Sequence, residues 1–141
     1  MSNAIEKNLN DNGVLKLSLN RPDVLNAMNA DLIMGLLEGF NEAKADKKVR
    51  SIIITGNGRG FCSGADLVDG GWPKTRGLTG GEAGAITMEN AFNPLVKAIT
   101  QSTKPVVNAI NGMAAGGGVG LALTGDIVVA AESAKFKLVF G

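Results

Sequence analysis

The sequence predicts an α/β fold built around a largely parallel sheet. Short segments of strand character alternate with segments of helical periodicity, glycine-rich turns join them, and no internal repeat is present. Such alternation is typical of parallel sheets, because a helix has to return the chain between neighbouring strands. The length of 141 residues, 45% of them hydrophobic and 19% charged, fits a single domain over residues 1–141.

The expected strands are short and differ in pattern. Residues 14–19 read VLKLSL, where apolar residues alternate with polar or basic ones, and this predicts a strand. Residues 51–55, SIIIT, are β-branched and predict a strand buried on both faces. Two further strands are expected at 105–110, which follows Lys104, and at 126–131.

Three helices are expected, at 29–45, 83–101 and 118–125. Apolar residues of the first recur at helical spacing, and either Asn29 or Asp31 can cap its start. The Gly/Thr/Pro-rich segment 70–82 predicts a mobile loop before the second helix.

Two segments, 52–67 and 106–123, share one pattern: a strand, a glycine-rich turn and a helix start. A helix start carries unpaired backbone N–H groups and a positive dipole end, and glycine lets a ligand approach them. Two converging starts would form an oxyanion hole. The alternatives are tight connections without function, or a dinucleotide fingerprint. The fingerprint is weak because Phe61 stands at its third glycine position, and no phosphate-loop Lys-Ser/Thr follows any glycine run.

The composition excludes several kinds of chemistry. The chain has no His, which rules out Ser-His-Asp and Cys-His catalysis and a His-ligated metal within it. Its one Cys, Cys62, excludes an internal disulfide or cysteine cluster, fits a cytoplasmic setting and is expected to be buried and inert. A net charge of +1 gives no electrostatic case for nucleic acid or a membrane surface. We therefore expect no metal, and catalysis by carboxylates, backbone amides, hydroxyls or Lys.

Three motifs together resemble the crotonase superfamily of enoyl-CoA hydratases and isomerases. They are RPDVLNAMN at 21–29, IIITGNGRGFCSGADL at 52–67 and KPVVNAINGMAAGGGVGLALTGDIVVAAESAKF at 104–136. The resemblance implies a spiral of ββα turns. Typical members are considerably longer, so it also implies that this chain is the N-terminal portion of such a fold, truncated before the C-terminal helices.

The resemblance also implies the site residues. Ala65 and Gly117 match the two positions whose backbone N–H groups form the oxyanion hole for an acyl-CoA thioester. Val24 and Ala27, with the 63–67 backbone, match the part that holds the CoA, and the substrate-binding set is Val24, Ala27, Ser63, Asp66, Leu67, Gly116 and Gly120. Asp66 is expected to cap a short helix rather than to catalyse. Acyl-CoA is then the substrate and no cofactor is implied. The implied assembly is a homotrimer or hexamer.

Gly120 stands where the hydratase pattern has one of its two Glu residues, and Phe140 stands at the place of the other. Syn addition of water by acid and base needs both carboxylates. The segments 78–99 and 133–141 resemble instead the isomerase branch that acts on ring-derived and unsaturated acyl-CoAs, where one carboxylate moves the proton. That carboxylate is expected beyond residue 141, with Glu82 or Glu89 as local alternatives. The chain alone is then expected to be close to inactive.

Two other functions stay open on the sequence. One is an enzyme of the naphthoate-synthase type, which also has glycine at the position of Gly120. The other is a non-catalytic subunit of the same fold that has lost its carboxylates.

Overall fold

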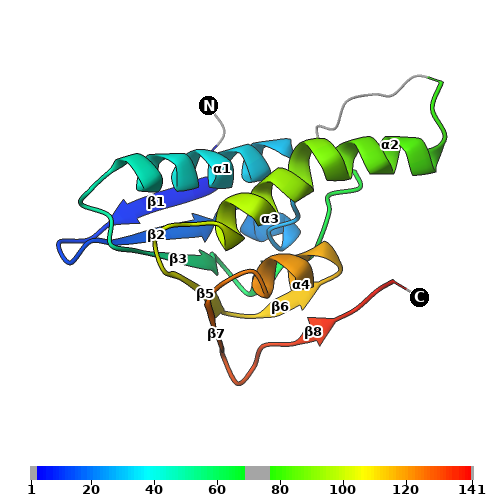
Figure 1. Cartoon of the computed structure of the whole chain (residues 1–141). Helices are drawn as coiled ribbons and strands as arrows, with labels where there is room; N and C mark the ends of the chain where they lie inside the picture. Colours follow the sequence, from blue (N-terminus) through cyan, green and yellow to red (C-terminus); the bar gives the residue numbers. More distant parts are fainter. Residues whose placement is uncertain (1–2, 69–76, 141) are drawn as a thin grey trace.

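A computed structural model describes residues 3–68 and 77–140 of the chain. Its strands are β1 (Ile5–Leu9), β2 (Val14–Leu19), β3 (Ser51–Gly56), β4 (Gly60–Cys62), β5 (Val106–Ile110), β6 (Met113–Ala115), β7 (Ile127–Ala130) and β8 (Phe136–Lys137). Its helices are α1 (Ala30–Ala45), α2 (Gly80–Thr87), α3 (Asn93–Thr100) and α4 (Gly117–Ala122), with a 3-10 turn η1 (Pro22–Val24) and a π-helical segment η2 (Met88–Phe92). Figure 1 shows their arrangement.

The strands form two sheets, and from β3 onward consecutive strands of the chain belong to the two sheets in turn. The larger sheet has the order β1-β2-β3-β5-β7 and the smaller one β4-β6-β8. Each of β3, β5 and β7 in the larger sheet is followed directly by a strand of the smaller one, and a helix follows β4 and β6. Apart from β1, which is antiparallel to β2, all pairings within the two sheets are parallel. The expected α/β architecture of ββα turns is therefore confirmed.

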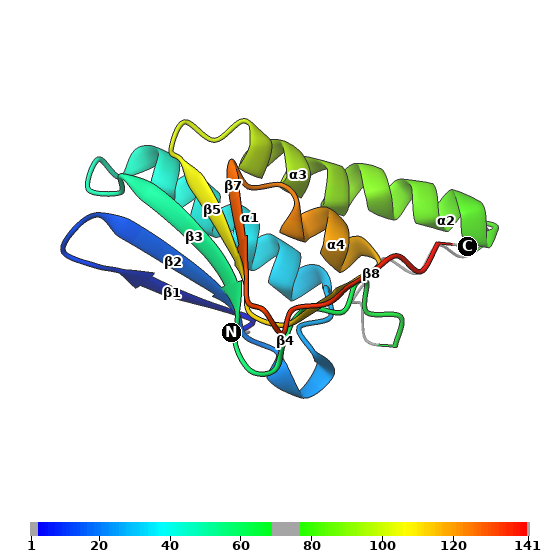
Figure 2. The ribbon, with the colours of Figure 1, turned by 90° about the horizontal axis from the view of Figure 1, so that it is seen from below.

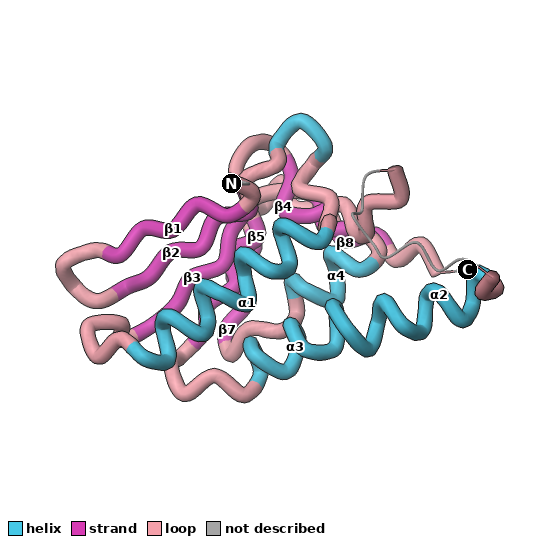
Figure 3. The backbone as a smooth tube through the Cα atoms, turned by 90° about the horizontal axis from the view of Figure 1, so that it is seen from above, coloured by secondary structure: helices cyan, strands magenta, loops and turns pink. Residues whose placement is uncertain are grey.

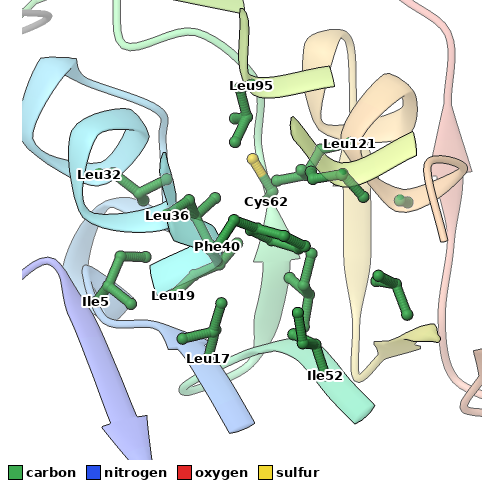
Figure 4. Close-up of a cluster of buried hydrophobic side chains, with 14 of the residues drawn as sticks. Ile5, Leu17, Leu19, Leu32, Leu36, Phe40, Ile52, Cys62, Leu95 and Leu121 are labelled. Carbon is green, nitrogen blue, oxygen red and sulfur yellow. The ribbon is translucent and has the colours of Figure 1, made fainter. Parts of the chain in front are cut away.

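The helices α1 and α3 pack across the larger sheet, as the views from below and above show (Figures 2 and 3). Between them and the sheet lies the hydrophobic core, in which Phe40 of α1 lies among side chains of β2, β3, β4 and α4 (Figure 4). Leu17 of β2 and Ile52 of β3 are completely buried. Each such side chain contributes about 1.5–3 kcal/mol by leaving water, which fixes the sheet and helices as one body. No helix of residues 3–68 and 77–140 combines the length and apolarity needed to cross a bilayer.

The start of α1 matches one of the two expected caps. The side-chain oxygen of Asn29 accepts a hydrogen bond from Leu32 N–H at 2.9 Å, whereas Asp31 lies exposed in the first turn. Asn29 is also nine-tenths buried, so the cap connects α1 to the loop that precedes it. This satisfies one of the orphan N–H groups of the helix start.

The second helix begins earlier than expected, at Gly80 instead of residue 83. Thr79 and Glu82 form a capping box, in which each side chain bonds the other residue's backbone N–H. Glu82 was expected in a loop, and this is wrong, because it lies in the first turn of α2. The helix continues through η2 to Thr100. The expected mobile segment 70–82 lies partly outside the described residues, at 70–76.

Other expectations need correction. β3 is not buried on both faces: Ile52 and Ile54 are buried, but Ile53 is half-buried because the helices cover only one face. No helix begins at Ala65 within the described residues, where 65–68 form a bridge and a bend. The last helix ends at Ala122 rather than at Gly125. The short strands β4 and β6 lie within stretches expected to be turns, where glycines hide the strand pattern.

The two glycines Gly118 and Gly120 of α4 offer a matched test of this packing. A Cβ on Gly118 would collide with the carbonyl of Cys62, whereas a Cβ on Gly120 would meet nothing within 4 Å. Gly118→Ala should therefore lower the free energy of unfolding by about 1–3 kcal/mol, as overpacking does. Gly120→Ala should raise it by about 0.5–1 kcal/mol, because glycine is a poor helix former. Urea unfolding of both variants measures this, and equal effects would contradict the packing described here.

Candidate active site

A cavity of about 370 Å³ lies between the start of α4 and the long helix formed by α2, η2 and α3. Its walls are mainly apolar, and the side chain of Asn93 is the one amide among the described residues that line it. The lining residues are Met28, Ala65, Met88, Phe92, Asn93, Leu95, Val96, Gly116, Gly117, Gly120, Leu121 and Phe140. Ala65 and Gly117, distant in the sequence, thus lie in one wall.

A parallel bridge between Met28 and Ala65 positions the first of these amides. Met28 N–H donates to the Gly64 carbonyl at 2.7 Å, and Asp66 N–H donates to the Met28 carbonyl at 2.9 Å. The groups on the Ala65 side of this bridge are the Gly64 carbonyl and the Asp66 N–H, so the N–H of Ala65 itself takes part in neither bond. Within residues 3–68 and 77–140, that N–H has no hydrogen-bond acceptor.

Gly117 supplies the second amide as the first residue of α4. Two nearby N–H groups are engaged: Gly116 N–H donates to the Lys137 carbonyl, and Val119 N–H donates to the Gly116 carbonyl, both at 3.0 Å. The N–H of Gly117 has no acceptor in the described part of the chain, as expected of the first residue of a helix. α4 is only six residues long, so the useful feature here is the free N–H group itself.

Each candidate amide directly follows a glycine in a left-handed conformation. Gly64 has φ +105° and Gly116 has φ +52°, values that residues with a Cβ rarely adopt. Space is limited as well, since a Cβ on Gly64 would lie 3.0 Å from the Ala115 carbonyl oxygen and 3.5 Å from Gly117 N. The two turns therefore touch.

Three of the expected CoA-binding residues lie together beside this wall. Ser63 Oγ donates to the Val24 carbonyl at 3.2 Å, and Ala27 N–H donates to the same carbonyl at 3.1 Å. Val24 is half-exposed and Leu67 almost completely exposed. None of these residues is among those that line the cavity, and their contact with CoA stays a prediction.

Asp66 is engaged in the fold itself. Its carboxylate lies 2.9 Å from Arg21 Nη1, and both side chains are largely buried. The other oxygen accepts from Val68 N–H at 3.0 Å, which makes a turn and not a helix cap. The pair joins the segment before α1 to the segment that carries Ala65.

The two positions of the hydratase carboxylates meet in the cavity. Gly120 and Phe140 both line it, and neither carries an acid. No Asp or Glu is among the described residues of its wall. Glu82 and Glu89 are exposed on α2 and η2, and hydrogen bonds from Thr79 lower the pKa of Glu82, which keeps it ionised at neutral pH. Neither is among the described residues that line the cavity.

The opposite wall consists of residues that the sequence did not single out. Met88, Phe92, Asn93 and Val96 come from η2 and α3. The spacing of four residues between Met88, Phe92 and Val96 was a usable signal of one helix face, but Met88 and Phe92 lie in a π-helical segment. Such segments change the helix register and are frequent at functional sites.

Cys62 at the end of β4 is completely buried, as expected. Burial raises the pKa of its thiol to about 11, and a hydrogen bond with the Gly64 backbone opposes this only in part. The thiol is therefore neutral at physiological pH and cannot act as a nucleophile.

Comparisons with known proteins agree on one family. The sequence model of the family described as enoyl-CoA hydratase/isomerase matches residues 10–141. The 1,2-epoxyphenylacetyl-CoA isomerase of Escherichia coli (strain K12) is 44% identical over 132 residues, which are 92% of this chain and 48% of that protein. This chain spans about half the length of the curated relatives it matches.

Solved structures give the same fold. The crystal structure of an enoyl-CoA hydratase from Mycobacterium avium subsp. paratuberculosis K-10 matches with a TM-score of 0.78 at 36% identity, over 97% of this chain and 48% of that one. A monofunctional enoyl CoA isomerase from M. smegmatis matches with a TM-score of 0.75 at 31% identity, over 96% and 53%.

The buried thiol gives a direct chemical test. At pH 8, a pKa of about 11 leaves roughly one Cys62 thiol in a thousand ionised, whereas an unfolded thiol with a pKa of ~8.5 is about a quarter ionised. We expect labelling by a chromogenic disulfide reagent to be more than 100-fold slower in the folded protein than in urea. Rapid labelling under native conditions would show that Cys62 is accessible and reactive.

The ion pair of Arg21 with Asp66 gives a second test. Arg21→Met keeps much of the side-chain volume but leaves the Asp66 carboxylate, which is mostly buried, without its cation. We expect a loss of about 1–3 kcal/mol in the free energy of unfolding. Lys7→Met is the control, because its partners Glu38 and Glu42 are exposed and such pairs contribute ~0–1 kcal/mol. Equal losses in urea unfolding would show that the Arg21 pair has no special structural role.

Proposed function

Because the chain belongs to the enoyl-CoA hydratase/isomerase family, we propose that its cavity receives the acyl group of an acyl-CoA. The N–H groups of Ala65 and Gly117 then donate hydrogen bonds to the thioester carbonyl oxygen. One observation carries this proposal. Two backbone N–H groups without acceptors in the described residues, each behind a left-handed glycine, share one wall of an apolar cavity.

The chemistry of a thioester suits such a wall. When the carbon next to the carbonyl loses a proton, negative charge develops on the carbonyl oxygen. Two fixed N–H donors stabilise this enolate oxygen more than the neutral carbonyl, and this difference lowers the barrier. The apolar lining excludes water that would compete for the donors. The step needs no titrating side chain from the described cavity wall.

Within the family we propose double-bond isomerisation and not hydration. Two-carboxylate hydration has no acid at Gly120 or Phe140 to use. Isomerisation needs one base, which removes a proton from the α-carbon of a 3-enoyl thioester. The electron pair delocalises into a dienolate, and the conjugate acid returns the proton to the γ-carbon. That carboxylate belongs to a part of the whole protein outside the described cavity wall. The 31% identity to a monofunctional enoyl CoA isomerase of known structure supports the same choice.

We assign the rest of the CoA to the segment beside the cavity that carries Val24, Ala27, Ser63 and Leu67. Val24 and Leu67 expose apolar side chains there, and a pantetheine arm or an adenine ring can cover them. Assembly of the whole protein as a trimer or hexamer stays a prediction, and its molar mass in solution tests it.

The Gly117 donor can be removed with little change in shape. Pro is tolerated at the first position of a helix, so Gly117→Pro deletes the N–H while α4 keeps its start. Gly117→Ala is the matched control, because it keeps the N–H and adds only a contact with Met28. For acetoacetyl-CoA bound to the whole protein, the enolate-to-keto ratio, read by ultraviolet absorbance, should fall about 10²–10³-fold in Gly117→Pro, as expected for a lost oxyanion donor. It should stay within about 3-fold in Gly117→Ala. An unchanged ratio in both variants would refute the assignment of Gly117.

The reaction itself separates isomerase from hydratase. The whole protein should isomerise a 3-enoyl-CoA at least 10-fold faster than it hydrates crotonyl-CoA, since general acid–base groups supply about 10²–10⁴ in rate and the hydratase pair is absent from positions 120 and 140. Glu82→Gln should leave both rates unchanged, because Gln can also complete the capping box. Fast hydration would contradict the isomerase proposal, and a large effect of Glu82→Gln would move the catalytic acid to α2.

A further inference from the structure

Asn108 is a completely buried amide in the middle of the larger sheet. It lies on β5, between Ile54 of β3 and Val128 of β7. Its side chain reaches the end of α4, with which it forms hydrogen bonds. Amides are uncommon at such positions, because a buried polar group has to be hydrogen-bonded to be tolerated.

The Asn108 amide nitrogen is bound to the end of α4. It donates to the carbonyl oxygens of Leu121 and Ala122, both at 3.0 Å, and lies 3.2 Å from Thr124 Oγ1. The last carbonyls of a helix lack intrahelical partners. α4 has no basic residue in its last turn. Thr124 donates to the Leu121 carbonyl with its N–H at 3.2 Å and its Oγ1 at 2.7 Å, and Asn108 is the donor that reaches both this carbonyl and that of Ala122 from outside the helix.

The start of α4 has no comparable side-chain anchor, since Gly116 at its N-cap makes no side-chain bond. A helix of six residues is about 9 Å long and moves as one rigid unit. A hold on its last carbonyls therefore also fixes the direction of its first N–H, which belongs to Gly117. A second contact that positions α4 is the close approach of Gly118 to the Cys62 carbonyl.

We propose that Asn108 is a positioning residue, which holds α4 so that the N–H of Gly117 faces the thioester oxygen. This rests on the proposed function, because the role of Gly117 is part of it. Asn108 touches no ligand and does not line the cavity.

A purely stabilising role is a poorer explanation. The Oδ1 atom of Asn108 is buried and has no hydrogen-bond partner among the described residues. An unsatisfied buried acceptor offsets part of what the three contacts of the amide nitrogen contribute. Asn108 therefore contributes less to the stability of the fold than its three contacts suggest, yet these contacts lie where they determine the position of α4.

The test is a double-mutant cycle on the whole protein with acetoacetyl-CoA as the probe. Asn108→Val removes the three contacts but suits a buried strand, and Asn108→Ser is a milder second variant. Asn108→Val should lower the enolate-to-keto ratio of the bound probe about 10-fold, because the N–H is displaced and not deleted. In a Gly117→Pro background the same change should alter the ratio less than about 2-fold, since residues that act through one group are not additive. Affinity for CoA without an acyl group should stay within about 2-fold.

Thr55→Val is the matched control. Thr55 Oγ1 of β3 donates to the carbonyl of Ala109, which is the neighbour of Asn108 on β5, at 2.8 Å. Within the described residues no hydrogen bond joins Thr55 to α4. This variant should leave the enolate-to-keto ratio unchanged, whatever it does to stability. Urea unfolding establishes that every variant is measured in its folded state.

Amide hydrogen exchange without any ligand separates the two proposals. Exchange of the α4 amides from Val119 to Leu123 should become at least 10-fold faster in Asn108→Val and not in Thr55→Val. Unchanged exchange would overturn the anchoring role of Asn108, whatever the ligand assays give. If exchange becomes faster in Asn108→Val but Gly117→Pro leaves the enolate-to-keto ratio unchanged, the anchoring role of Asn108 stands and the proposed function is refuted. If Asn108→Val lowers the enolate-to-keto ratio by the same factor in the original protein and in Gly117→Pro, the claim that Asn108 acts through Gly117 is overturned.

Discussion

The candidate site depends on the close approach of α4 to the backbone of β4. Gly118 lies against the carbonyl of Cys62 so closely that no Cβ fits between them. This contact brings the turn before α4 next to the turn after β4, so that Gly64 and Gly117 become neighbours. Any side chain at Gly118 would push these two turns apart, and with them the amides of Ala65 and Gly117.

The chemical groups that we propose for this site are backbone groups, and the composition of the chain is compatible with this proposal. A chain without His has no ordinary neutral-pH base, and its single Cys is held neutral by burial. Backbone N–H groups need no pKa adjustment, and the fold alone sets their direction. Side chains then serve two other purposes here: Arg21 and Asp66 hold the segments together, and Met88, Phe92 and Val96 make the opposite wall apolar.

Parts of the fold with a clear periodic pattern could be predicted. β2, β3, β5 and α1 lie where the sequence pattern placed them, because each has a buried apolar face. β7 was also placed correctly, although all four of its residues are exposed. β1 was missed since only Ile5 of its five residues is buried, and an edge strand of this kind has no apolar pattern. β4 and β6 were missed because three residues are too few to show a period, and glycines precede both strands. The start of α2 was misplaced because Gly80 and Gly81 argue against a helix that the capping box nevertheless initiates.

By itself the sequence determined the fold class, the two glycine-rich turns and, through a family resemblance, which residues to examine. The tertiary structure decided what a local pattern cannot contain: that the glycines at 64 and 116 are left-handed, that Gly120 and Phe140 share one cavity, and that Asn108 holds the end of α4. Propensity and periodicity act over a few neighbouring residues. The direction of a peptide N–H and the meeting of two turns some fifty residues apart are set by packing between distant segments.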